Sequence, residues 1–396
     1  MVHLSMTICL LLLNGLLVNG RTRSPDEENL GPLCITCSCS ADKSHVDCSR
    51  RGITELPDEF FEQTKTLNLS NNEITTFPEN LSRFYNLVNL DISGNRLSEV
   101  PENALRNVSA LEVLNLSRNY FDTWLNINPN HLFTQVPNLR HLDLSHNSFK
   151  TMGNLANQEL IISASIETLI LENCEIDAVY GRSPLSGLSN IKNFILSNNP
   201  LTRIQNLISP TLQSLEVSNC ALSTINHNDL MFLPVLTSLK ISNNNRLELS
   251  STNNHLFSNS LKYLDISYCS VSRTDLQGFP NLQRAILNHN TIRYLDSKEF
   301  TNNSKLEHLD LSYNNIGSLK SDTFRGLAAL KFLDLSWNEL ALLPEDSLLD
   351  MPSLIQLKLE RNFLTSVGHL MSMSIAVLDM SSCEINTIGK DSLEGL

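Results

Sequence analysis

Basic residues and long apolar runs are both scarce in this sequence. Lys and Arg total 29 against 42 Asp and Glu, which gives a formal net charge of −13. This acidity argues against a nucleic-acid or anionic-membrane binder, because such proteins displace counterions with clustered Lys and Arg. Beyond residue 20 no apolar run reaches 18 residues, so the sequence predicts no membrane span.

Enzyme signatures are also missing, and the sequence predicts no catalytic, cofactor-binding or metal-binding residues. The nearest candidates for a metal site are two H-x-D pairs, His141 with Asp143 and His308 with Asp310. Their Asp belongs to a phrase that recurs elsewhere, so a solvated polar face explains both pairs better than a metal does. An enzyme is therefore the most distant of the functional alternatives.

The chain begins with an apolar leader. Residues 8–18 read ICLLLLNGLLV, a length typical of a signal peptide and too short to cross a bilayer. Val18 and Gly20 suit a cleavage site. We predict a signal peptide over 1–20 and a polar linker over 21–33, and therefore a secreted protein or one on the extracellular face of the plasma membrane.

Internal repetition dominates the rest of the sequence. Fourteen copies of one six-residue phrase follow residue 63, with spacings of 21 to 28 residues. The copies read LNLSNN, LDISGN, LNLSRN, LDLSHN, LILENC, FILSNN, LEVSNC, LKISNN, LDISYC, AILNHN, LDLSYN, LDLSWN, LKLERN and LDMSSC. The alternation L-x-L predicts a short strand with one apolar face, which stacked neighbours must cover. The closing Asn is expected to turn inward and satisfy backbone groups.

With its flanking leucines, the phrase completes L-x-x-L-x-L-x-x-N/C-x-L and resembles the leucine-rich repeat family. The resemblance implies an α/β solenoid with a curved parallel sheet over residues 63–396. Within that family, the sequence is similar to Toll-type receptor ectodomains and to adhesion proteins of the chaoptin and connectin kind. The sequence stops after GKDSLEGL, without a cysteine-rich C-terminal flank, and this led us to expect a longer natural protein.

Four closely spaced cysteines precede the first repeat: Cys34, Cys37, Cys39 and Cys48. Behind a signal peptide such a group indicates disulfides, with zinc as the weaker rival, and sequence alone allows three pairings. The segment 34–62 resembles the N-terminal flank of extracellular leucine-rich repeat proteins. That resemblance implies a cap over the first repeat, with Cys34 paired to Cys39 and Cys37 to Cys48.

Four further cysteines replace the closing Asn of a phrase: Cys174, Cys220, Cys269 and Cys383. The nearest two lie two repeats apart, about 10 Å at the strand spacing of a sheet. A disulfide needs Cα atoms within about 7 Å, so we predict buried free thiols.

Five sequons predict N-linked glycans, at Asn68, Asn80, Asn107, Asn115 and Asn302. Asn68 and Asn115 occupy the middle x of L-x-L and therefore project from the concave sheet. Glycans there would crowd the N-terminal part of that face. The alternative is that LNLS is a common variant of the repeat consensus and that its Asn carries no glycan.

The residue before the closing Asn or Cys is aromatic in four consecutive repeats, at Tyr268, His289, Tyr313 and Trp337. Stacked repeats would bring these rings into one column, with Tyr263, His308 and Phe332 beside it on the concave face. Aromatic clusters are typical of binding hot spots, although an aromatic side chain here could simply shield the Asn row. A long curved sheet favours a binding surface, and the family resemblance implies a ligand-binding receptor of innate-immune or developmental signalling. The alternative is an adhesion or matrix protein that binds a protein partner or another copy of itself.

Overall fold

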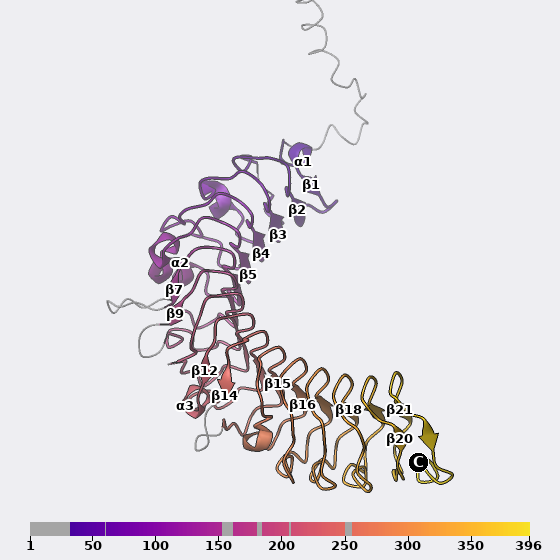
Figure 1. Cartoon of the computed structure of the whole chain (residues 1–396). Coiled ribbons are helices and arrows are strands. Elements are labelled where there is room, and N and C mark those ends of the chain that lie inside the picture. Colours follow the sequence, from indigo (N-terminus) through magenta and orange to yellow (C-terminus); the bar gives the residue numbers. More distant parts are fainter. Residues whose placement is uncertain (1–31, 60, 153–160, 180–183, 206, 250–255) are drawn as a thin grey trace, which may run out of the picture.

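A computed structural model of the chain describes residues 32–59, 61–152, 161–179, 184–205, 207–249 and 256–396. Over these residues the chain winds into a curved solenoid, with its main sheet along the inner side of the arc (Figure 1). The predicted fold class is confirmed. The predicted signal peptide lies outside the described residues.

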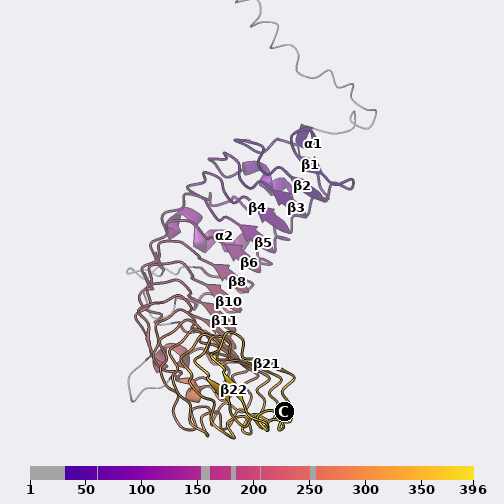
Figure 2. The same ribbon diagram turned by 45° about the vertical axis from the view of Figure 1, so that its right-hand side comes forward.

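One sheet of 16 strands runs the length of the solenoid in sequence order. Its first two strands, β1 (Ser38–Cys39) and β2 (His45–Asp47), are antiparallel, and β2 is parallel to β3 (Thr66–Asn68). The other thirteen strands continue the parallel register. They are β4 (Asn89–Asp91), β5 (Val113–Asn115), β6 (His141–Asp143), β8 (Thr168–Ile170), β10 (Asn193–Ile195), β11 (Ser214–Glu216), β13 (Ser238–Lys240), β15 (Tyr263–Asp265), β16 (Arg284–Ile286), β17 (His308–Asp310), β18 (Phe332–Asp334), β19 (Gln356–Lys358) and β21 (Val377–Asp379). Figure 2 shows the strands of this sheet from β4 to β11 following one another along the inner edge.

Each of these strands except β21 buries its central residue and leaves the outer two partly or fully exposed. In β18, Leu333 is fully buried between Phe332 and Asp334, which face the concave side. The buried leucines of successive repeats join into one continuous core. Each contributes about 1.5–3 kcal/mol on burial, so the stack stabilises strands too short to persist alone.

The closing Asn residues form the expected inward ladder. The Nδ2 of Asn95 donates to the carbonyl oxygens of Leu69 at 2.9 Å and Ile92 at 3.0 Å. Its Oδ1 accepts from the backbone N–H of Ile74 at 3.1 Å. One side chain thus ties its own turn to the preceding repeat and satisfies buried backbone groups that the turn leaves open.

The residue before each closing Asn or Cys has a left-handed backbone, a constraint that the sequence analysis did not predict. In all fourteen repeats its φ lies between 50° and 62°. This conformation favours Asn and Gly and costs about 1–3 kcal/mol for other residues. The occupants are Asn71, Gly94, Arg118, His146, Asn173, Asn198, Asn219, Asn243, Tyr268, His289, Tyr313, Trp337, Arg361 and Ser382.

Short elements form the outer side of the arc (Figure 1). The helices there are α2 (Pro129–Gln135) and α3 (His227–Met231), with 3-10 turns η2 (Glu79–Arg83), η3 (Trp124–Ile127) and η4 (Leu276–Gly278). Three two-stranded parallel sheets join neighbouring repeats, namely β7 (Thr151–Met152) with β9 (Ala178–Val179), β12 (Thr224–Ile225) with β14 (Glu248–Leu249), and β20 (Ser366–Val367) with β22 (Thr387–Ile388). No helix in the part of the chain that the structure describes could cross a bilayer.

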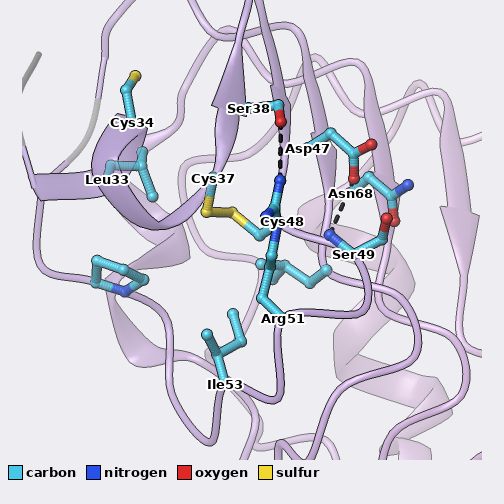
Figure 3. The surroundings of a disulfide bond; sticks show 12 residues. Leu33, Cys34, Cys37, Ser38, Asp47, Cys48, Ser49, Arg51, Ile53 and Asn68 are labelled. Atoms are coloured by element: carbon cyan, nitrogen blue, oxygen red, sulfur yellow. Dashed lines mark hydrogen bonds between the residues drawn. A yellow bond between two sulfur atoms is a disulfide. The ribbon is translucent and has the colours of Figure 1, made fainter. Parts of the chain in front are cut away.

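A disulfide-bonded cap covers the N-terminal end of the core. Both disulfides implied by the resemblance are present, Cys34–Cys39 and Cys37–Cys48, with Cα separations of 5.6 and 4.3 Å. Figure 3 shows Cys37–Cys48 beside Arg51, whose guanidinium donates to the Ser38 hydroxyl at 2.9 Å. Helix α1 (Pro32–Thr36) lies at the start of this cap, with Leu33 fully buried.

Candidate functional site

Four stacked rings form a column along one edge of the concave sheet, as the sequence predicted. Tyr268, His289, Tyr313 and Trp337 follow one another with ring centroids 4.1, 4.1 and 4.8 Å apart. The planes of adjacent rings differ by only 10–13°. Their left-handed backbone is held by hydrogen bonds to the next repeat, such as Trp337 N to Glu360 O at 2.7 Å. We call these four residues the edge column.

A second row lies on the strands themselves. Tyr263, Arg284, His308 and Phe332 open the consecutive strands β15 to β18 and face each other in register. His308 stacks on Phe332 with centroids 4.2 Å apart. Arg284 separates Tyr263 from this pair, and the sequence prediction of the cluster did not include it. We call these four residues the strand row, and the two rows together the aromatic strip.

Each row ends in a cation at its C-terminal side. The Arg361 guanidinium lies 4.5 Å from the ring centroid of Trp337, and the Lys358 ammonium lies 5.4 Å from that of Phe332. Both are cation–π contacts. The chain therefore covers the last aromatic face of each row, while the stacking covers the faces between the rings of the edge column.

Stacking leaves mainly the ring edges and their polar tips to solvent. Tyr268, Tyr313 and Trp337 are 47, 40 and 39% exposed. Among the described residues, neither tyrosine hydroxyl nor the Trp337 indole N–H has a hydrogen-bond partner. Ring edges carry positive charge and suit carbonyl or carboxylate oxygens and the faces of other aromatics. The strip therefore offers donors to a partner.

Carboxylates line the floor between the two rows. Asp265, Asp310 and Asp334 lie in register on β15, β17 and β18, with Ile286 of β16 between the first two. Each Asp accepts a hydrogen bond from the backbone N–H of the Ser two residues later, at 2.9–3.0 Å. These bonds orient the carboxylates.

Two histidines of the strip carry lowered pKa values. Burial lowers the pKa of His289, and the nearby Asp310 carboxylate opposes this shift. Burial also lowers the pKa of His308, with smaller effects of the same sign from Arg284 and Lys358. Both imidazoles are therefore neutral at pH 7, and the strip gains positive charge as the pH falls.

The other candidate residues lie elsewhere on the solenoid. His141 and Asp143 are on β6, away from the strip in sequence and repeat number. Across the described ranges, no three His, Cys, Asp or Glu residues gather in a way that could hold a metal. Cys174, Cys220, Cys269 and Cys383 are free thiols as predicted, but only Cys174 and Cys269 are buried, and Cys220 and Cys383 are part exposed. Burial raises the pKa of Cys174 to about 12 and that of Cys220 and Cys269 to about 11, which disfavours nucleophilic chemistry.

The five predicted glycan acceptors fall on two sides of the molecule. Asn68 and Asn115 end β3 and β5 on the concave side, and each uses its Oδ1 to accept from the backbone N–H of a Ser. Asn80 and Asn302 donate to carbonyl oxygens of the preceding repeat, at 3.2 Å to Pro57 and 3.2 Å to Gln277. Asn107 is exposed in a left-handed conformation.

Comparison with known proteins identifies the repeats. Two family profiles, both described as leucine-rich repeat, match residues 85–149 with 280–340 and residues 63–84 with 260–282. Podocan of Mus musculus is 28% identical over 72% of this chain and 46% of podocan. Oligodendrocyte-myelin glycoprotein of Homo sapiens is 30% identical over 52% of this chain and 42% of that protein. The chain thus spans less than half the length of both relatives.

A solved structure shares the fold. The crystal structure of the mouse RP105/MD-1 complex matches with a TM-score of 0.58 at 22% identity, over 76% of this chain and 51% of the matched one. Leucine-rich repeats are thus identified over residues 63–149 and 260–340, and the chain is similar to podocan and oligodendrocyte-myelin glycoprotein.

Proposed function

We propose that this chain is the protein-binding part of an extracellular receptor or matrix protein, and that its partner contacts the aromatic strip. The observation that carries the proposal is the difference between the two tryptophans. Trp124 is half-buried and donates its indole N–H to the Thr151 carbonyl oxygen at 2.7 Å. Trp337 is 39% exposed and has no such partner in the described part of the chain.

Two further features support the strip as a contact surface. Its rings are ordered by stacking before any partner arrives, so binding would order few side chains and cost little entropy. Tyr, Trp and Arg are also the residues enriched at binding hot spots. The resemblance to Toll-type receptors and to chaoptin-type adhesion proteins stays a prediction, as does the choice between a signalling and an adhesive role.

The test begins with a panel of extracellular proteins that includes the chain itself. The secreted full chain is screened against the panel, and the Kd of each recovered partner is then measured. Tyr313 and Trp337 are replaced together by Asn, because Asn suits the left-handed backbone and occupies the same position in five other repeats. We expect normal secretion and binding weakened about tenfold or more, about 1.4 kcal/mol.

A matched control removes two exposed tyrosines from other repeats. Tyr85 and Tyr120 are 43 and 65% exposed and lie outside the strip. The double variant Tyr85→Asn, Tyr120→Asn should bind every recovered partner as the natural chain does. Unchanged binding by the Tyr313→Asn, Trp337→Asn protein, or equal loss in the control, would contradict the proposal. Recovery of the chain by itself would identify the adhesive alternative.

A further inference from the structure

Both aromatic rows begin in the same repeat, at Tyr263 and Tyr268. Tyr263 lies in register with Ser238 of β13, and Asn243 precedes Tyr268 in the edge column. Both neighbours are smaller than a ring. Within the described residues, no ring or cation stacks on the N-terminal face of either tyrosine. The N-terminal end of the strip therefore leaves one ring face of Tyr263 and one of Tyr268 open. We call this end of the strip the step.

The opposite ends of the rows show what such a face binds in this chain. Arg361 covers Trp337 at 4.5 Å, and Lys358 lies 5.4 Å from the Phe332 centroid. A cation over an aromatic face is attracted by the negative charge of the ring quadrupole. The N-terminal faces of Tyr263 and Tyr268 have the same electrostatic character, and no cation of the described chain occupies them.

Asp265 lies between the two tyrosines and keeps an oxygen available. Its Oδ1 accepts from the Ser267 backbone N–H at 3.0 Å and from the Ser267 hydroxyl at 2.7 Å. Its Oδ2 accepts from no group in the described chain. The other two carboxylates of the floor differ. Asn288 donates to Asp310 Oδ2 at 2.9 Å, and Lys358 lies 3.6 Å from Asp334 Oδ2.

Lys240 lies directly opposite Asp265 in the register of β13 and β15, but among the described residues neither Lys240 nor Arg284 forms an ion pair with this carboxylate. The Lys240 ammonium on β13 lies 3.2 Å from Glu216 Oε2 and so forms its ion pair with the preceding repeat. Arg284 follows Tyr263 on the side of the strip away from the step. Asp265 is therefore a carboxylate without an ion-pair partner among the described residues, flanked by two open ring faces.

We infer that this step binds an arginine side chain of the protein partner, stacked on Tyr263 or Tyr268 and bonded to Asp265. This inference rests on the proposed function and adds the chemistry of the partner. A planar guanidinium can lie on a ring face and still direct N–H groups at a carboxylate, whereas an ammonium is a compact point charge. An arginine is therefore preferred to a lysine, and a sugar would use the faces without needing the charge of Asp265.

The test uses a synthetic peptide of three Gly-Ser-Arg-Ser-Gly segments, with versions that carry lysine or citrulline in place of arginine. Citrulline keeps the planar shape and removes the charge. The full chain is immobilised and the Kd of each peptide is measured. We expect the arginine peptide to bind about tenfold more tightly than the citrulline peptide, with lysine between them.

Two variants and one control locate the site. Asp265→Asn and Tyr268→Asn should each weaken the arginine peptide about fivefold or more. Asp91→Asn, in the same position of another repeat, should change nothing, since Asp91 makes the matching bond to Ser93 at 2.9 Å. Equal binding of arginine and citrulline peptides, equal effects of Asp265→Asn and Asp91→Asn, or displacement of the arginine peptide by cellohexaose would overturn the inference.

The two proposals fail separately. The proposed function fails if the Tyr313→Asn, Trp337→Asn protein binds the whole partner normally. The present inference fails only on the peptide measurements, which require no natural partner.

Discussion

Trp124 donates its indole N–H to the carbonyl oxygen of Thr151, one repeat further along the chain, at 2.7 Å. Its ring also stacks on Phe149, with centroids 4.5 Å apart. The 3-10 turn η3 presents this side chain on the outer part of a long repeat, where it fastens two turns together. Trp124 is thus hydrogen-bonded to a neighbouring repeat, whereas the indole N–H of Trp337 has no partner in the described part of the chain.

That difference predicts that the two tryptophans contribute unequally to stability. Trp124→Phe should lower the free energy of unfolding by about 1–3 kcal/mol, because the Thr151 carbonyl loses its donor. Trp337→Asn should change it by about 0.5 kcal/mol or less, since the indole is exposed and Asn suits the left-handed backbone. Urea denaturation followed by circular dichroism measures both. A larger loss for Trp337→Asn than for Trp124→Phe would assign Trp337 a structural role.

The cap disulfides should matter more than the repeat cysteines. Replacing Cys37 or Cys48 by Ser should cost on the order of 2–5 kcal/mol and reduce secretion. Cys220→Ser should cost less, because a hydroxyl is close in size to the thiol and can also donate to the Leu196 carbonyl oxygen. Secretion yield and urea midpoints compare the three variants, and a Cys220→Ser protein as impaired as Cys37→Ser would contradict this ranking.

The repeat thiols should also resist alkylation. Raised pKa values near 11 and 12 keep Cys174, Cys220 and Cys269 protonated at pH 8, and only the thiolate reacts with iodoacetamide. In native protein these three residues should stay unlabelled, whereas urea should expose them to full labelling. Peptide mapping reads each site. Rapid labelling of a native thiol, or a disulfide at any of them, would refute the prediction.

Glycan occupancy at Asn68 and Asn115 tests which part of the concave face can be covered by a partner. Both side chains end strands of the concave sheet, in the first and third repeats. If glycans occupy them, the N-terminal part of that sheet is crowded and the main contact lies elsewhere. Glycopeptide mass spectrometry of secreted protein should find both modified. Bare Asn68 and Asn115 would remove this argument.

Mild acid should destabilise the strip. Burial lowers the folded-state pKa values of His289 and His308 below the ordinary value of 6.5, so the unfolded chain binds more protons as the pH falls through that value. Stability should therefore fall between about pH 7 and pH 5, where most carboxylates do not yet titrate. Thermal unfolding of the natural chain and of a His289→Gln, His308→Gln protein measures this. An equal loss of stability in both would exclude these histidines as the cause.

The regular part of the molecule could be predicted from the sequence because it repeats. The buried Leu, the inward Asn and the outward x positions recur fourteen times, so each position can be assigned without a structure. The edge column could be predicted in the same way, because its four residues occupy the same position of four consecutive repeats. The left-handed backbone before each closing residue was missed, although its signal was present. Five Asn and one Gly occupy that position, and these are the residues that tolerate φ near 55°.

Other features depend on contacts that no repeat position encodes. Arg361 and Lys358 reach back over rings of the preceding repeat, and the interruption of the strand row by Arg284 follows from register across three strands. The contact of Trp124 with Thr151 arises in the long irregular part of a repeat, where spacing gives no guidance. The additional hydrogen bond at Asp310, absent at Asp265, is donated by Asn288, which occupies a position that holds Ser in most other repeats.

The Asn ladder gives the solenoid a defined response to stretching. Each closing Asn bonds to the preceding repeat, so a pull along the axis of the arc loads these bonds one interface at a time. A repeat that detaches releases on the order of 70–100 Å of extended chain, given about 3.3–3.6 Å per residue. At Cys174 the thiol donates to the Leu144 carbonyl oxygen but is only a weak acceptor. Rupture under tension should therefore begin at the four repeats closed by cysteine.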